Sequence, residues 1–155
     1  ITIDSPVFYG NLTAYENLQV ICRYRDISDN KINEALEIFE LEGNKIKFRH
    51  YSMGMRQRLT LAAGFLFRPK LMVLDEPFNG IDPSGVIMIR KLITKLNREN
   101  GITFLISSHL LREVGSFCTH YGIIDHGELI ETGEITKDIE ELENKYIAAV
   151  GGGAK

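Results

Sequence analysis

The spacing of apolar residues changes along the chain, and the first part has the spacing of helices. Thr13 and Glu16 stand three positions apart, as in a capping box, so a helix is expected to begin there. Further along, one helical face is formed by Ile32, Ala35, Leu36 and Phe39. This pattern predicts a mainly helical subdomain over residues 14–66.

After residue 66 the pattern changes to short apolar runs, which are typical of buried strands. We expect strands at residues 71–74, 102–107 and 121–125, because each run is short and bounded by turn-forming or polar residues. His126 and Gly127 follow the third run and predict a turn into a further strand.

Helical segments separate these runs. Asp82 followed by Pro83 is typical of a helix start, with proline at the first helical position. The helix that it opens carries on one face Ile89, Leu92, Ile93 and Leu96. Alternating strands and helices predict an α/β fold with a mostly parallel sheet over residues 67–134, and a last helix and tail are expected over residues 135–155.

The composition is that of an ordinary globular domain and argues against several classes of function. Of the 155 residues, 44% are hydrophobic and 25% are charged, which is enough apolar material for one core. A formal net charge of -3 gives no general attraction to nucleic acid, so no nucleic-acid partner is expected. The longest apolar stretch is too short to span a bilayer, and we expect no signal peptide; a role at a membrane would be peripheral.

Two adjacent carboxylates, Asp75 and Glu76, directly follow the apolar run at residues 71–74. In a parallel sheet, functional groups collect at the carboxyl ends of the strands. One carboxylate there can hold Mg²⁺, while the next orients or deprotonates a water that attacks a terminal phosphate. The pair taken alone favours a simpler interpretation, an N-terminal charge pair satisfied by the following turn.

The sequence around Asp75 and Glu76 favours the catalytic interpretation over the simple charge pair. The stretch LMVLDEPFNGIDP, residues 71–83, resembles the Walker B motif and D-loop of ATP-binding cassette (ABC) transporter ATPases, and YSMGMRQRL, residues 51–59, resembles their signature motif. The resemblance implies a P-loop NTPase-like cassette with an inserted helical subdomain, and ATP and Mg²⁺ as its cofactors. It also implies that Asp75 holds the metal, that Glu76 is the catalytic base and that Asp82 of the D-loop belongs to the nucleotide site.

Two residues of the signature-like stretch match the family pattern. Ser52 and Gly54 stand at the start of a predicted helix whose N-terminus suits an anion, and the resemblance implies that they clamp a nucleotide phosphate. Met53 and Met55 replace the glycine and glutamine that are usual in the family. Taken alone, Ser52 is better explained as an ordinary helix N-cap.

A histidine follows the second expected strand. The stretch LISSHLLREV, residues 105–114, resembles the family's switch segment, which implies that His109 contacts the terminal phosphate and holds the catalytic glutamate in place. Taken alone, His109 is better explained as an ordinary residue at a helix start.

The first residues resemble the family's Q-loop region. The family usually has glutamine two residues before the proline, and here Asp4 precedes Pro6. An acidic residue at this place resembles the bacitracin and lantibiotic peptide-exporter group, and it implies that Asp4 approaches Mg²⁺ directly or through water. An aspartate that caps a turn before proline is the competing interpretation.

The family's Walker A loop, GxxxxGK followed by Ser or Thr, does not occur in this sequence. The resemblance covers nearly the whole chain, which corresponds to the cassette from the Q-loop onward. We therefore expect that this polypeptide alone has no measurable ATP turnover and binds nucleotide weakly. We also expect exposed edges on the strands at residues 102–107 and 121–125, since the strand that precedes Walker A lies between them in the related fold.

The resemblance also implies partners and a location. It implies the ATP-hydrolysing subunit of an exporter, which in the group named above exports antimicrobial peptides. Such a subunit pairs with a second nucleotide-binding domain, as a homodimer or heterodimer, and with a transmembrane permease. It lies on the cytoplasmic face of the cell membrane, and the permease contact is expected near residues 8–15, where three aromatic residues accompany a capped helix. The alternative is a non-catalytic module that docks on a permease or on a complete ATPase, which the missing Walker A loop favours for this chain.

Overall fold

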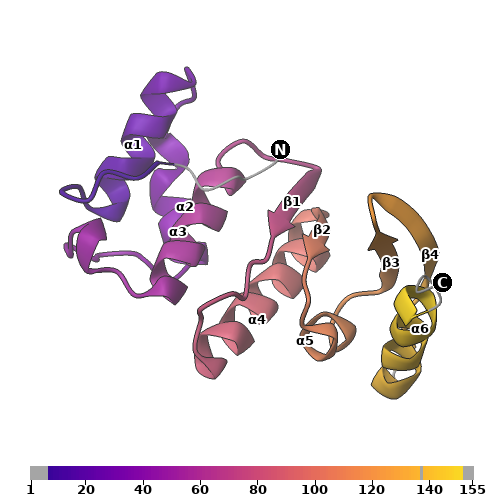
Figure 1. Ribbon diagram of the computed structural model, residues 1–155. Helices are drawn as coiled ribbons and strands as arrows, with labels where there is room; N and C mark the ends of the chain where they lie inside the picture. Colours follow the sequence, from indigo (N-terminus) through magenta and orange to yellow (C-terminus); the bar gives the residue numbers. More distant parts are fainter. Residues whose placement is uncertain (1–6, 137, 152–155) are drawn as a thin grey trace. The chain divides into compact units, whose positions relative to one another are not determined.

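The computed structural model describes residues 7–136 and 138–151, which form two compact units with the boundary between Ser107 and Ser108. The elements of the first unit are α1 (Ala14–Tyr24), the 3₁₀ turn η1 (Asp29–Lys31), α2 (Ile32–Ile38), the 3₁₀ turn η2 (Phe48–His50), α3 (Met53–Phe65), β1 (Leu71–Asp75), α4 (Pro83–Asn100) and β2 (Thr103–Ser107) (Figure 1). Those of the second unit are α5 (Leu111–Gly115), β3 (His120–Asp125), β4 (Glu128–Glu134) and α6 (Ile139–Gly151).

All elements described between residues 14 and 66 are helical, as the sequence predicts. The capping box that opens α1 is formed in both directions: Glu16 N–H donates to the Thr13 hydroxyl at 3.3 Å, and Thr13 N–H donates to Glu16 Oε2 at 2.7 Å. The helices enclose a small apolar core whose largest members are almost fully buried. These are Leu18, Ile32, Phe39, Leu41, Leu59 and Leu61.

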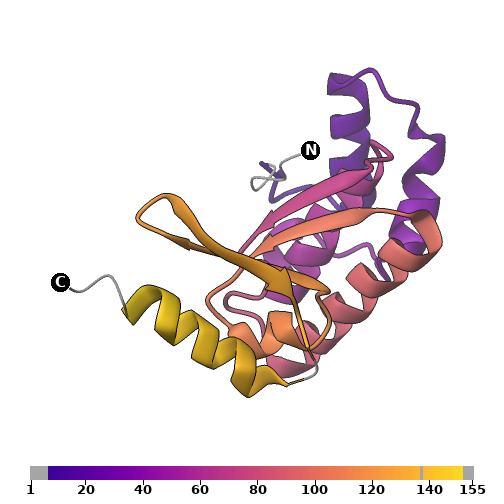
Figure 2. The same ribbon diagram turned by 90° about the vertical axis from the view of Figure 1, so that its right-hand side faces the viewer.

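Strands β1 and β2 form a parallel pair, in register from Leu71 opposite Thr103 to Asp75 opposite Ser107. The helix between them, α4, packs along this pair (Figure 2) and buries the predicted apolar face. Asp82 is its N-cap and Pro83 its first residue, again as predicted. Because the strands are parallel and in register, their carboxyl ends meet at Asp75 and Ser107.

In the second unit, β3 and β4 form an antiparallel hairpin (Figure 2). Its turn consists of His126 (φ 48°) and Gly127 (φ 83°), two residues in the left-handed conformation that short hairpin turns require. The mostly parallel sheet predicted from the sequence is therefore wrong for the described strands, which form one parallel and one antiparallel pair. The reason is the two-residue turn, since it can join only antiparallel neighbours.

Among the described strands, β2 pairs only with β1 and β3 only with β4, so each of the two has one edge that no described strand covers. Leu105, in the middle of β2, is 60% exposed although its strand is apolar in sequence. The open edges expected from the missing Walker A strand are thus present in the described part of the chain.

Candidate nucleotide and metal site

The candidate site begins where β1 and β2 end together. Asp75 is the last residue of β1, Glu76 follows it, and the parallel register places Ser107 opposite Asp75. The Ser107 hydroxyl donates a hydrogen bond to Asp75 Oδ1 and accepts one from Glu76 N–H at 3.1 Å. Glu76 N–H also donates to the Ser107 carbonyl at 3.2 Å. Ser107 is therefore bonded both to the Asp75 carboxylate and to the backbone of Glu76.

The role of Ser107 was missed in the analysis of the sequence, which singled out only His109 in the same stretch. Two apolar runs of equal length, LMVLD and TFLIS, could have indicated this role, because each ends in a polar residue. Parallel pairing in register brings those two polar residues side by side. Strand pairing, however, depends on the fold and not on the local sequence.

The backbone at Glu76 has an uncommon conformation. Its φ is +43°, in the left-handed region that residues with a β-carbon rarely adopt, and the buried Pro77 follows it. A turn begins here, in which Asn79 N–H donates to the Glu76 carbonyl at 3.1 Å. Residues held in such conformations concentrate at functional sites, because the surrounding structure must maintain them against their intrinsic preference.

Asp82 is engaged at the start of α4. Its carboxylate accepts hydrogen bonds from the Ser84 hydroxyl and from Gly85 N–H, the latter at 3.3 Å. The bond from Ser84 and then that from Gly85 lower the pKa of Asp82, so its side chain is a charged helix cap. A contact between Asp82 and nucleotide remains a prediction.

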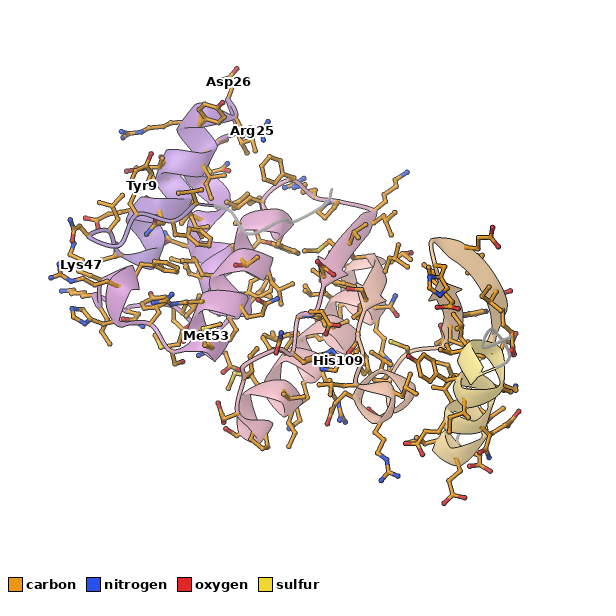
Figure 3. The ribbon with its side chains drawn as sticks, viewed as in Figure 1. Tyr9, Arg25, Asp26, Lys47, Met53 and His109 are labelled. Carbon is orange, nitrogen blue, oxygen red and sulfur yellow. The ribbon has the colours of Figure 1, made fainter. Side chains whose placement is uncertain are left out.

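The signature-like residues lie at the N-terminus of α3. Ser52 is exposed, and its hydroxyl accepts a hydrogen bond from Met55 N–H at 3.3 Å, which makes it the N-cap of the helix. Gly54 lies in the first helical turn, and Met53 is 52% exposed at the same helix end (Figure 3). The simpler interpretation of Ser52 as a cap is thus correct for this structure. A capped, exposed helix start is also the geometry that can receive a phosphate.

Two predicted residues, His109 and Asp4, do not belong to the described part of the first unit. His109 is exposed, two residues beyond the end of β2, and belongs to the second unit (Figure 3). Asp4 lies outside the described residues. Within the described part of the chain, no group of three or more His, Cys, Asp or Glu side chains is arranged to hold a metal ion. The structure therefore brings Ser107 to Asp75 and Glu76, and the roles of all the predicted site residues stay predictions.

The surface predicted for a permease lies around the segment before α1. Val7, Tyr9 and Tyr15 are 88%, 56% and 38% exposed, whereas the ring of Phe8 packs on Phe48 with 5.0 Å between centroids. Two of the three expected aromatic residues are therefore accessible. None of the helices in residues 7–136 and 138–151 is both long and apolar enough to cross a membrane.

This segment is bound to the one that precedes the signature-like stretch. Phe48 N–H donates to the Leu12 carbonyl at 2.8 Å, and Arg49 N–H donates to the Gly10 carbonyl at 3.0 Å. The Arg49 guanidinium also donates to Asn11 Oδ1 at 2.9 Å. The exposed aromatic surface and the start of α3 are thus linked through residues 47–51.

A family model described as "ABC transporter" matches residues 2–79, half of the chain. The chain belongs to the ABC transporter family. Within it, the chain is related to the ATP-binding proteins of bacitracin and lantibiotic transport. It is 42% identical to the bacitracin transport ATP-binding protein BcrA of Enterococcus faecalis, over 93% of this chain and 47% of that protein. It is 38% identical to the lantibiotic transport ATP-binding protein SrtF of Streptococcus pyogenes, over 94% of this chain and 64% of that protein.

A solved structure shows the same fold. The protein cbiO1 of Clostridium perfringens, part of the ABC transporter complex cbiONQ, superimposes with a TM-score of 0.77 at 25% identity, over 95% of this chain and 59% of that chain. The fold is therefore that of the ABC cassette, a mixed α/β fold, of which this chain covers a part. The chain also spans about half the length of the first curated relatives that it matches, between 47% and 49% of each.

Proposed function

We propose that this chain is part of the ATP-hydrolysing subunit of an ABC exporter for antimicrobial peptides. The observation that carries the proposal is the cluster of Asp75, Glu76 and Ser107 at the joined ends of β1 and β2. The names of the bacitracin and lantibiotic relatives support the choice of exported substrate.

The chemistry of the donor set fits a magnesium nucleotide. Mg²⁺ in such sites takes one or two carboxylates, with waters and phosphate oxygens completing its shell, so the exposed Asp75 suffices as a protein ligand. Asp4 is the proposed second carboxylate. When bound, the metal neutralises charge on the phosphates.

The remaining roles belong to the protein's own side chains. Glu76 accepts a proton from the attacking water, and His109 donates a hydrogen bond to the terminal phosphate. Ser52, Gly54 and Asp82 act on the nucleotide held by a second nucleotide-binding domain, since the exposed start of α3 is free to approach another subunit. A transmembrane permease contacts the surface around Tyr9 and Tyr15 at the cytoplasmic face of the membrane.

This polypeptide alone does not turn over ATP in our proposal, because its sequence contains no Walker A loop to hold the phosphates. A non-catalytic docking module is the second candidate, and the same feature of the sequence favours it. The coding sequence upstream of Ile1 distinguishes the two candidates, because only the ATP-hydrolysing subunit requires a Walker A loop to be encoded there.

The test compares the 155-residue chain with an extended protein that includes the residues encoded upstream. We expect magnesium-dependent ATP hydrolysis from the extended protein only, and a loss of at least about 100-fold in Glu76→Gln with ATP binding retained. Asn79→Ala, which changes an exposed residue of the following turn, is the control for a general effect of substitution there. An extended protein without a Walker A loop and without turnover would establish the docking module instead.

A further inference from the structure

The first unit contains a pocket at the end where β1 and β2 begin. Its volume is about 270 Å³. The apolar part of its lining comes from the end of α3 and from the residues that lead into the two strands, and consists of Phe65, Leu66, Pro69 and Ile102. Leu66 and Ile102 are only 5% and 3% exposed, so this wall belongs to the packed core of the unit.

The pocket lies away from the candidate nucleotide site. Pro69 comes shortly before β1, and Ile102 directly precedes β2, whereas Asp75 and Ser107 are the last residues of the same two strands. A strand of five residues is about 16 Å long. The pocket is therefore at the amino ends of the strands and the cluster of Asp75, Glu76 and Ser107 is at their carboxyl ends.

The charged part of the lining carries an excess of positive charge. It consists of Lys31, Glu34 and Arg68, so that one carboxylate faces two cations. Lys31 Nζ lies 2.7 Å from Glu34 Oε2. The hydrogen bond and charge of Lys31 are the main cause that lowers the pKa of Glu34, and the charge of Arg68 adds to it. Because Lys31 is engaged with Glu34, Arg68 is the cation that a ligand can use.

The backbone turn after α3 places Arg68 next to the apolar wall. Arg68 has a φ of +47°, which is uncommon for a residue with a β-carbon, and the proline that follows restricts its backbone further. Its N–H donates to the Phe65 carbonyl at 2.9 Å. The side chain of Arg68 is exposed, so its guanidinium is accessible from solvent at the pocket.

We propose that this pocket binds a small amphipathic carboxylate, such as an aromatic acid. The apolar body of the ligand packs against Phe65, Leu66, Pro69 and Ile102, and its carboxylate accepts two parallel hydrogen bonds from the guanidinium of Arg68. An apolar cavity with a few polar groups is typical of small-molecule sites, and this volume is at the lower end of their range. The ligand is therefore about the size of one ring with a short acidic side chain.

Two compounds of opposite charge test the proposal. 3-Phenylpropionate and 3-phenylpropylamine have the same ring and the same number of carbon atoms, but one is an anion and the other a cation. Each is titrated into the 155-residue chain while the NMR signals of the amides at residues 31–34, 65–68 and 100–103 are followed. For a ligand of this size we expect a dissociation constant of about 5 mM for the acid, and binding at least about fivefold weaker for the amine.

Arg68→Gln and Arg98→Gln make a matched pair of variants. Both remove one exposed guanidinium, but Arg98 lies on α4 and does not line the pocket. We expect Arg68→Gln to weaken binding of 3-phenylpropionate about tenfold, because a bidentate charged hydrogen bond is lost, and Arg98→Gln to bind as wild type. Equal affinity in Arg68→Gln and wild type would overturn the proposal, as would tighter binding of the amine or shifts that do not saturate below about 50 mM.

The same titration on the extended protein completes the test. We expect it to bind 3-phenylpropionate as the 155-residue chain does. Loss of binding there would mean that residues encoded upstream fill the pocket, and would also overturn the proposal. The pocket uses neither Asp75 nor Glu76, so the result of the turnover experiment with Glu76→Gln bears on the proposed function and not on this site.

Discussion

Ser107, the last residue of β2, donates a hydrogen bond to Asp75, the last residue of β1, and thereby fixes the carboxylate that the sequence assigns to the metal. The same hydroxyl accepts a hydrogen bond from Glu76 N–H. A residue that orients a metal-binding carboxylate affects metal affinity even though it does not touch the metal.

Ser107→Ala should therefore weaken the magnesium dependence of the extended protein. We expect the Mg²⁺ concentration for half-maximal turnover to rise about tenfold, and the 155-residue chain to lose about 0.5–1.5 kcal/mol of stability in urea. Ser107→Thr keeps the hydroxyl and should retain both properties. Ser108→Ala is the control, because that hydroxyl bonds only locally in the described structure, to Leu110 N–H at 3.0 Å; an equal rise in this variant would contradict the assignment.

Asn17 is a buried polar residue, only 2% exposed, and it holds the segment before α1 in place. Its Oδ1 accepts from Tyr9 N–H at 2.7 Å, and its amide donates to the carbonyls of Tyr9 and Thr13 at 3.2 and 2.9 Å. These bonds fix the loop that carries the exposed Tyr9. Asn17 thus holds the loop from the side of α1, while Phe48 and Arg49 bind it through other groups.

Asn17→Ala should destabilise the chain by about 3 kcal/mol, because backbone groups in a buried site lose their partner. Urea unfolding measures this, and the control Asn33→Ala, an exposed position on α2, should stay within about 0.5 kcal/mol of wild type. If both substitutions had the same small effect, the amide would not be what orders the loop.

Structural features that depend on neighbouring residues could be predicted from the sequence. The capping box at Thr13, the Asp82–Pro83 helix start and the His126–Gly127 turn all form as expected, because each depends on residues within four positions. Motif spacing was also sufficient to identify the family.

Contacts between segments that are far apart in the chain could not be predicted from the sequence. The bond from Ser107 to Asp75 spans 32 positions, and the bond from Phe48 N–H to the Leu12 carbonyl joins two loops of the helical region. Such contacts follow from strand register and helix packing, which no single segment encodes. For the same reason the sheet was expected to be mostly parallel, although the described strands form one pair of each kind.

Glu16 gives the stability of the chain a dependence on pH. The backbone N–H of Thr13 is the main cause that lowers the pKa of Glu16, and the ammonium of Lys47, 3.1 Å away, is the next. A carboxyl group whose pKa is lower in the folded chain stabilises the fold above its ordinary pKa. This contribution is lost as the pH falls through the lowered value.

We therefore expect Glu16→Gln to be less stable than wild type near neutral pH, and the difference to shrink toward zero as the pH falls through the lowered pKa of Glu16. Urea midpoints at several pH values measure this, with Glu37→Gln, an exposed change on α2, as the control. Glutamine can still accept the backbone hydrogen bond, so the variant reports mainly on charge. A difference that is constant across the acid range would mean that Glu16 acts through packing alone.

Gly133, on β4, lies against the ring of Tyr121 on β3. A Cβ at Gly133 would stand 2.9 Å from the ring, and the ring is held there because its phenol donates to Glu131 at 2.6 Å and Lys145 Nζ lies 5.6 Å from its centroid. Gly133→Ala should therefore destabilise the chain by about 1–3 kcal/mol, although alanine is otherwise acceptable in a strand. In a Tyr121→Ala background the same substitution should cost almost nothing, because the ring that it would strike is gone. Equal costs in the two backgrounds, measured by urea unfolding, would show that Gly133 is needed for its backbone conformation and not for the space it leaves.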